Sequence, residues 1–133
     1  MALGALQSVF GMQAELCKAL ASPHRLAILC SLREGEMCVS DLARALDVSV
    51  PNTSQHLRVL QERGLVRSRK NGQTVYYSIT NPKFTQACTL IREALIEQHR
   101  AAGECLLAAE NLETLAQPIA ASSAREPKRV PWP

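Results

Sequence analysis

The chain has 133 residues, 47% of them hydrophobic and only 4% aromatic, with a formal net charge of +3. This length and composition predict a single domain with an aliphatic core. No apolar run approaches the roughly 20 residues that cross a bilayer, and residues 1–6 lack the basic charge of a secretory signal. We therefore expect a cytoplasmic protein without a membrane partner, in which the five cysteines stay reduced thiols.

Two helices are predicted first in chain order. Apolar side chains near helical spacing predict a helix over residues 3–20. Ser22 and Pro23 favour the start of a second helix, because serine caps a helix N-terminus and proline fits its first turn. Apolar residues carry this second helix to Gly35.

A pair of helices joined by a tight turn is predicted next. Residues 40–46 form a short helix, residues 47–49 the turn, and residues 50–63 a longer helix. Gly64 ends that helix, since glycine is the usual residue just after a helix C-terminus. Leu57 and Leu60 face the core, which leaves the polar side chains near the start of the longer helix for recognition.

A β-hairpin follows. Residues 65–70 and 74–79 read as strands on either side of Asn71-Gly72, a strong hairpin signal. Tyr76 and Tyr77 are neighbours in a strand, so one should be buried and the other exposed. The fold class is therefore mainly α with a small β-hairpin: a winged helix-turn-helix, which is a device for reading duplex DNA.

A long helix is predicted from Asn81-Pro82 onward. The folded domain should span residues 1–117, and residues 118–133, rich in proline, alanine, serine and arginine, should form a disordered tail. The first and last helices carry more apolar surface than one small domain needs. We expect a homodimer through these two helices, the alternative being that they pack only within one subunit.

Basic charge coincides with the DNA-reading elements. Residues 48–92 hold seven basic side chains and one acidic one, a net charge of +6, although the whole chain carries only +3. Such a segment indicates phosphate binding, while a solvated charged face is the alternative.

The candidate DNA contacts follow from this arrangement. Short polar side chains near the start of a recognition helix reach base edges, and Gln55 can pair with adenine through two hydrogen bonds. Ser49 can cap the helix or hold a phosphate, and His56 either contacts DNA or packs at the core edge. The full predicted set, with the wing residues that should meet phosphate or the minor groove, is Ser49, Asn52, Thr53, Ser54, Gln55, His56, Arg58, Arg67, Arg69, Lys70 and Gln73.

The order of these signatures resembles the ArsR/SmtB family of winged-helix repressors. The resemblance covers residues 10–100 and is carried by residues 16–29, Cys38-Val39-Ser40-Asp41-Leu42, residues 54–60, Gly64-Leu65-Val66 and residues 75–79. It implies a homodimeric, cytoplasmic repressor of double-stranded operator DNA. Such a repressor leaves its operator when a metal, a metalloid or a thiol-reactive signal binds.

The resemblance also indicates where a signal would act. The family's Cys-Val-Cys-Asp-Leu box reads Cys38-Val39-Ser40 here, so one thiolate is missing, and the family's zinc site on the last helix lacks its ligands. Cys30 matches a sulfur-sensing cysteine and ranks first among the thiols. Its usual partner position falls near Ile96, so Cys38 or Cys88 is the expected partner. The candidate effector thiols are Cys30, Cys38, Cys88 and Cys17; no metal site is assigned, and As(III) or another soft metal is a candidate ligand.

Two other interpretations stay open. The cysteines can be small buried hydrophobes, which would make the chain a regulator without an inducer of its own. A winged helix can also serve protein contacts, in which case no salt-dependent binding to duplex DNA is expected. An enzyme is not expected, because no paired carboxylates and no Cys-His couple at motif spacing are present.

Overall fold

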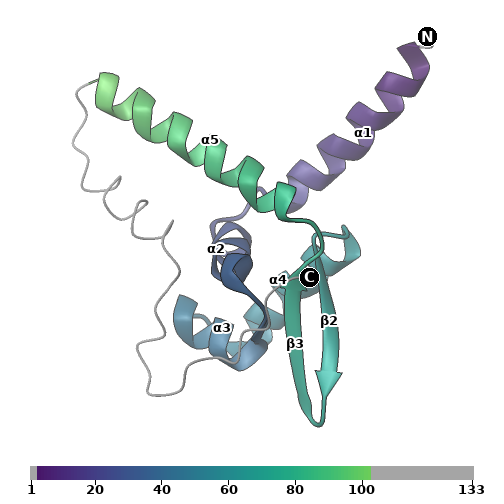
Figure 1. The fold of residues 1–133 in the computed structure, drawn as a ribbon, viewed down its shortest axis with the longest axis vertical. Coiled ribbons are helices and arrows are strands. Elements are labelled where there is room, and N and C mark those ends of the chain that lie inside the picture. The colour runs from purple at the N-terminus through teal and green to yellow at the C-terminus, as the bar shows by residue number, and fades with distance from the viewer. Residues whose placement is uncertain (1–2, 103–133) are drawn as a thin grey trace.

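The computed structural model describes residues 3–102. The predicted tail 118–133, Cys105 and the part of the last helix beyond Ala102 lie outside the described residues. Within this range, helices are interspersed along the chain with the short strands of one small sheet (Figure 1). In chain order the elements are α1 (Leu3–Ala19), α2 (Pro23–Ser31), a 3-10 turn (Leu32–Glu34), β1 (Met37–Cys38), α3 (Val39–Leu46), α4 (Val50–Glu62), β2 (Val66–Asn71), β3 (Thr74–Ile79) and α5 (Pro82–Ala101).

Three helices begin in the same way, with a polar cap and a proline in the first turn. The Ser22 side chain accepts a hydrogen bond from the Arg25 backbone N–H at the start of α2. Asn81 accepts one from Lys83 at the start of α5, and Ser49 caps α4 by accepting one from the Asn52 N–H. The cap oxygens satisfy donors that have no partner inside the helix, so the predicted starts of α2 and α5 are confirmed.

The turn between α3 and α4 is also determined by neighbouring residues. Asp47 ends α3 in the left-handed conformation, with a φ of 53°, which aspartate tolerates better than most residues. Gly64 has a φ of 76° just after α4, as the sequence predicted for a glycine in this place. The helix itself ends one residue earlier than predicted, at Glu62.

The sheet has three antiparallel strands in the order β1-β3-β2, rather than the hairpin alone. The strand β1 has only two residues, too few to show an alternating pattern. The hairpin turn is shifted by one residue from the prediction, because Asn71 still pairs with Thr74 and the loop is therefore Gly72-Gln73. Gly72 supplies the positive φ, 65°, that a two-residue hairpin loop needs.

The prediction that one tyrosine is buried and the other exposed is wrong. Tyr76 and Tyr77 are both half-buried. Tyr77 packs against the core, while Tyr76 lies beneath the guanidinium of Arg69. Both tyrosines lie on the central strand β3, which pairs with β1 on one side and with β2 on the other.

The core is aliphatic, as the composition predicted. It joins the inner faces of α2, α3 and α4 to the sheet, and α5 packs on α2. The hydrophobic side chains that are completely or almost completely buried are Ile28, Leu29, Leu32, Met37, Leu42, Leu57, Leu60, Leu65 and Val66.

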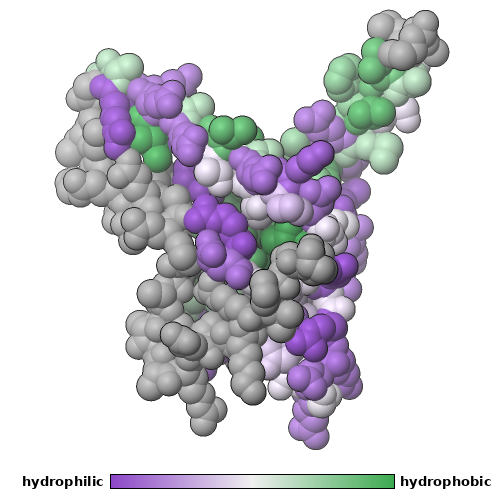
Figure 2. Space-filling view, viewed as in Figure 1, coloured by the Kyte–Doolittle hydropathy of each residue, from purple (hydrophilic) through white to green (hydrophobic). Residues whose placement is uncertain are grey.

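Two helices extend away from this body. In Figure 1, α1 and α5 diverge at the end of the molecule opposite the β2–β3 hairpin. Figure 2 shows apolar residues gathered on the α1 arm, whereas the hairpin is hydrophilic. No helix within residues 3–102 is long and apolar enough to cross a membrane. The exposed apolar side chains of the two arms are Leu6, Val9, Phe10, Met12, Leu90, Ile91 and Leu95.

Candidate nucleic-acid interface

The helix α4 has one buried and one exposed face. Leu57 and Leu60 are fully buried and hold α4 against the core, as predicted. Asn52, Gln55 and Arg58 are exposed and recur every three residues, so they share the outer face. These three side chains are placed where a helix lying in the major groove would present them to base edges.

Thr53 departs from the predicted set of DNA contacts. Its side chain is only 1% exposed, and its hydroxyl donates a hydrogen bond to the Ser49 carbonyl at 2.9 Å. Thr53 precedes Leu57 by four residues and Leu60 by seven, so helical periodicity puts all three on the core face. We therefore remove Thr53 from the set, while Ser54 stays as a half-buried flank of the outer face.

His56 packs at the core edge, the second of the two roles foreseen for it. The His56 ring stacks on His24 of α2, with the ring centroids 5.3 Å apart and the planes at 22°. Burial, and then the positive charges of Arg25 and His24, lower the pKa of His56. The lowered pKa favours the neutral form of the ring, and the stack connects α2 directly to α4.

The hairpin lies beside the recognition helix. The Gln61 amide at the end of α4 donates a hydrogen bond to the Ser68 hydroxyl on β2 at 3.2 Å, which fixes the wing relative to α4. All four predicted wing contacts are exposed: Arg67, Arg69, Lys70 and Gln73. Because the hairpin faces solvent at its tip, these side chains are accessible to a bound duplex.

Arg69 has a partner that the sequence did not reveal. Its guanidinium forms two hydrogen bonds with the carboxylate of Glu36, which is 4% exposed and directly precedes β1. The Arg69 guanidinium is therefore engaged within the protein while its side chain stays half-exposed, and its contact with phosphate or the minor groove remains a prediction. Glu36 lies far from Arg69 in the sequence, and no local pattern marked it as a partner.

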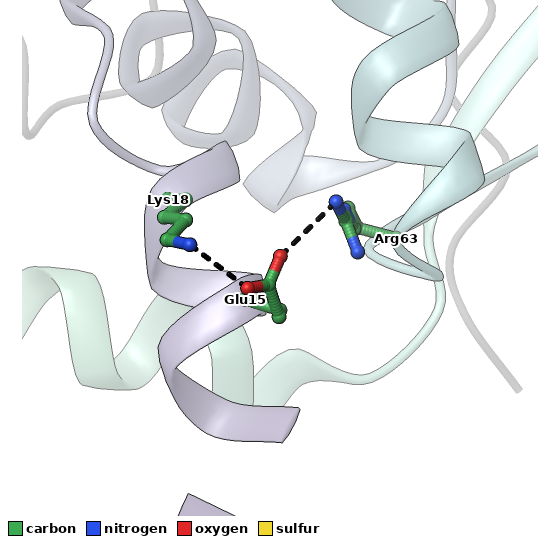
Figure 3. Close-up of polar contacts among 3 residues, drawn as sticks. All are labelled: Glu15, Lys18 and Arg63. Atoms are coloured by element: carbon green, nitrogen blue, oxygen red, sulfur yellow. Dashed lines mark hydrogen bonds and ion pairs between the residues drawn. The ribbon is translucent and has the colours of Figure 1, made fainter. Parts of the chain in front are cut away.

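A second acidic residue connects the N-terminal helix to the recognition helix. In Figure 3 the Glu15 carboxylate lies between Lys18, at 2.8 Å, and Arg63, at 3.3 Å, just after the end of α4. The hydrogen bond from Lys18 is the main reason that the pKa of Glu15 is lowered. Arg63 is therefore engaged within the protein. Arg58, Arg67, Lys70 and Lys83 are further basic side chains on the surface, all of them exposed.

Three of the four candidate thiols lie on the packed helices α1, α2 and α5, near enough for Cys17 and Cys30 to affect Cys88 but not as a cluster that could hold a metal ion. Cys30 and Cys88 are buried and Cys17 is exposed. Burial raises the pKa of Cys88, and Cys17 and Cys30 lie close enough to raise it further, against a lowering effect of Arg92. Cys17 and Cys88 also line one open cavity of about 910 Å³ between α1 and α5.

Cys38 lies apart from this group. It caps α3, where burial is the main cause of its raised pKa and its interacting neighbours are Asp41 and Ser40. Cys88 is therefore better placed than Cys38 as a partner for Cys30. Within residues 3–102, no three histidine, cysteine or acidic side chains stand together in a way that could hold a metal ion.

A helix-turn-helix with an exposed polar recognition face, followed by a basic hairpin, defines a DNA-binding protein of the winged-helix class. Residues 22–68 match the family described as "Bacterial regulatory protein, arsR family". Together with the relatives below, this match shows that the chain belongs to the ArsR family. The members of this family are DNA-binding transcriptional regulators, not enzymes.

Two curated relatives and one solved structure illustrate the match. A biofilm growth-associated repressor of Xylella fastidiosa (strain Temecula1) is 35% identical over 89 residues, 67% of this chain and 78% of the relative. The arsenical resistance operon repressor of Escherichia coli (strain K12) is 43% identical over 86 residues, covering 64% and 74%. A homodimeric winged helix-turn-helix domain of Mycobacterium bovis, solved by NMR, is 28% identical with a TM-score of 0.62, covering 74% of this chain and 89% of that one.

The exposed face of α4 leads to a first prediction. We expect Gln55→Ala to weaken binding to the cognate operator by about 1–3 kcal/mol, because a bidentate contact to a base edge is lost. Binding to random duplex DNA should change much less, since phosphate contacts are retained. Fluorescence anisotropy with both duplexes measures the difference, and equal losses on the two would show that Gln55 does not read a base.

Proposed function

We propose that the chain is a homodimeric, cytoplasmic repressor that leaves a two-fold operator when a signal reacts with its cysteines. The observation that carries the proposal is the position of Cys17 and Cys88 on one cavity between α1 and α5, with the buried Cys30 nearby on α2, which packs against α4. The DNA-binding part of the proposal rests on the exposed face of α4 and on the wing.

The dimer is proposed from the two extended arms. Ile91 is 62% exposed and Phe10 is 61% exposed, and an exposed apolar surface of this kind usually marks a partner face. A second copy is the economical partner, because a two-fold operator requires a two-fold protein. The homodimeric Mycobacterium bovis relative supports this arrangement. We place dimerisation within a domain spanning residues 1–117 and treat residues 118–133 as a separate tail.

The signal is proposed to act by linking thiols on different helices. A disulfide, a bridging sulfur or a soft ion such as As(III) would shorten the distances between α1, α2 and α5. Two contacts would pass that movement to α4: the stacked rings of His24 and His56, and the ion pair of Glu15 with Arg63. A coupling of about 1–3 kcal/mol would change operator affinity about 5- to 150-fold, so the movement can be small.

Reactive sulfur and oxidants suit this group better than a metal ion that needs a preformed site. Two thiols suffice for a disulfide or a sulfur bridge, while the described residues contain no three-ligand cluster. Trivalent arsenic stays in the proposal because it is soft and binds thiolates, and because the E. coli relative is an arsenical resistance repressor.

The experiment is release from a fluorescent operator after treatment with As(III), Cd(II), Zn(II), Cu(I) or a low-molecular-weight persulfide. We expect Cys88→Ser and Cys30→Ser to bind the operator like the parent but to stay bound under the signal that releases the parent. Cys38→Ser is the matched control and should release normally. Thiol counting in the native protein accompanies the assay, since unaltered release by both variants would leave these cysteines with a structural role only.

A further inference from the structure

A buried carboxylate holds the wing through one arginine. We propose that Glu36 and Arg69 form a strut that sets the position of the β2–β3 hairpin against the body, and that Arg69 is a positioning residue rather than a phosphate contact. The inference rests on the DNA-binding function of the chain. It does not depend on which signal, if any, the cysteines read.

The Arg69 guanidinium and the Glu36 carboxylate form a bidentate ion pair. The Arg69 Nε donates to one Glu36 carboxylate oxygen at 2.7 Å, and the Arg69 Nη2 donates to the other. The Glu36 side chain is 6% exposed, whereas that of Arg69 is 50% exposed. Paired hydrogen bonds between a guanidinium and a carboxylate restrict orientation as well as distance, so the arginine side chain is fixed at its tip.

The strut crosses the whole sheet. Tyr76 of β3 pairs with Arg69 of β2 on one side and with Cys38 of β1 on the other. The Arg69 guanidinium carbon lies 5.2 Å from the centre of the Tyr76 ring, so the side chain runs over this ring to reach Glu36. The edge strand of the wing is therefore tied directly to the chain segment that enters β1.

That segment belongs to the rigid part of the molecule. Met37, the residue after Glu36, is 2% exposed and lies in the central core cluster. The Gln61–Ser68 hydrogen bond is another side-chain contact between the wing and the body, and both of its partners are exposed. The Glu36–Arg69 pair is thus the better shielded of the two attachments.

Bound DNA should not displace Arg69 from this position. If the guanidinium moved to a phosphate, the Glu36 carboxylate would be left buried without its counter-charge, which is strongly unfavourable. The exposed Lys70, one residue further along β2, has its side chain on the opposite face of the strand and can meet phosphate instead. Removing Lys70 should therefore lower the salt dependence of binding, while removing Arg69 should not.

The test avoids stranding a buried charge, because it compares Glu36→Gln with the double variant Glu36→Gln, Arg69→Gln. We expect Glu36→Gln to weaken binding to operator and to random duplex about 2- to 10-fold, the scale of one weakened charge-assisted hydrogen bond. The double variant should bind no more weakly than Glu36→Gln and should show the same slope of log affinity against log salt. Lys70→Ala is the control and should reduce that slope by about one.

Hydrogen exchange of the free protein gives an independent readout. The backbone amides of residues 66–79 should exchange faster in Glu36→Gln than in the parent, while those of α4 should not change. Tighter DNA binding by Glu36→Gln, or a further drop in affinity and salt slope on adding Arg69→Gln, would show that Arg69 contacts phosphate and would overturn the proposal. Unchanged exchange and unchanged affinity in Glu36→Gln would also overturn it.

Discussion

Leu95→Glu is expected to give monomers that still fold but bind the operator about 10²- to 10⁴-fold more weakly than the parent. Leu95 is 46% exposed on α5, and its neighbour Ile91 is 62% exposed. A carboxylate in the proposed interface would lose its water without gaining a partner, which opposes association. Two joined recognition helices bind as one unit, and a monomer loses that gain in effective concentration.

The matched control adds the same charge to a different side of α5. Gln86 is exposed and shares its side of the helix with Glu93 and Glu97, which lie seven and eleven residues further on. Gln86→Glu should therefore remain dimeric and bind normally. Sedimentation velocity at matched protein concentrations measures the assembly state, and an intact dimer in Leu95→Glu would place the interface elsewhere on the molecule.

The elements that the sequence predicted well depend on neighbouring residues alone. The cap at Ser22, the cap at Asn81 and the positive φ of Gly64 are decided within a few residues, and all three are present. The strand β1 was not predicted, because a strand of two residues is too short to show an alternating hydrophobic pattern. Its existence depends on pairing with Tyr76 and Tyr77, which follow it by almost forty residues.

The candidate DNA contacts were predicted less well than the helix caps, because contacts between separate elements decide where these side chains lie. Polar composition placed Thr53 and His56 with the other recognition residues, although the spacing of Thr53 from Leu57 and Leu60 was itself a signal of burial. The stack of His56 on His24 and the ion pair of Glu36 with Arg69 could not be predicted, because each joins residues from separate elements. The count of basic residues in the sequence overstated the positive charge available to DNA, because Arg63 and Arg69 form ion pairs within the protein.

The thiols show how structure narrows a choice that the sequence left open. The sequence placed Cys30 first among the candidate thiols by its family position, with Cys38 or Cys88 as the expected partner and Cys17 as a further candidate. The packing of α1, α2 and α5 brings Cys17 and Cys30 near enough to affect Cys88, while Cys38 interacts with Asp41 at the start of α3. The predicted pairing of Cys30 with either Cys38 or Cys88 is thus reduced to Cys88 as the better-placed partner.

Leu57→Ala is expected to lower the free energy of unfolding by about 2–5 kcal/mol, the usual cost of truncating a buried leucine. Leu57 is completely buried on the inner face of α4, in the cluster that also contains Leu29 and Leu42. A loss of this size is a large part of the roughly 5–15 kcal/mol that stabilises a typical domain. The recognition helix would lose one of the two fully buried leucines that hold it against the core, so operator binding should fall together with stability.

Two control variants test whether the stability lost in Leu57→Ala comes from its buried side chain rather than from any substitution in α4. Leu57→Met nearly conserves volume and should cost less than about 1.5 kcal/mol. Val50→Ala removes a side chain that is 45% exposed at the start of the same helix and should cost much less than Leu57→Ala. Urea unfolding must be followed at one fixed protein concentration, because the stability of a dimer depends on concentration. A loss below about 1 kcal/mol in Leu57→Ala would mean that α4 is held mainly by its other contacts, and the stacked histidines and the Glu15–Arg63 pair would then be the next attachments to remove.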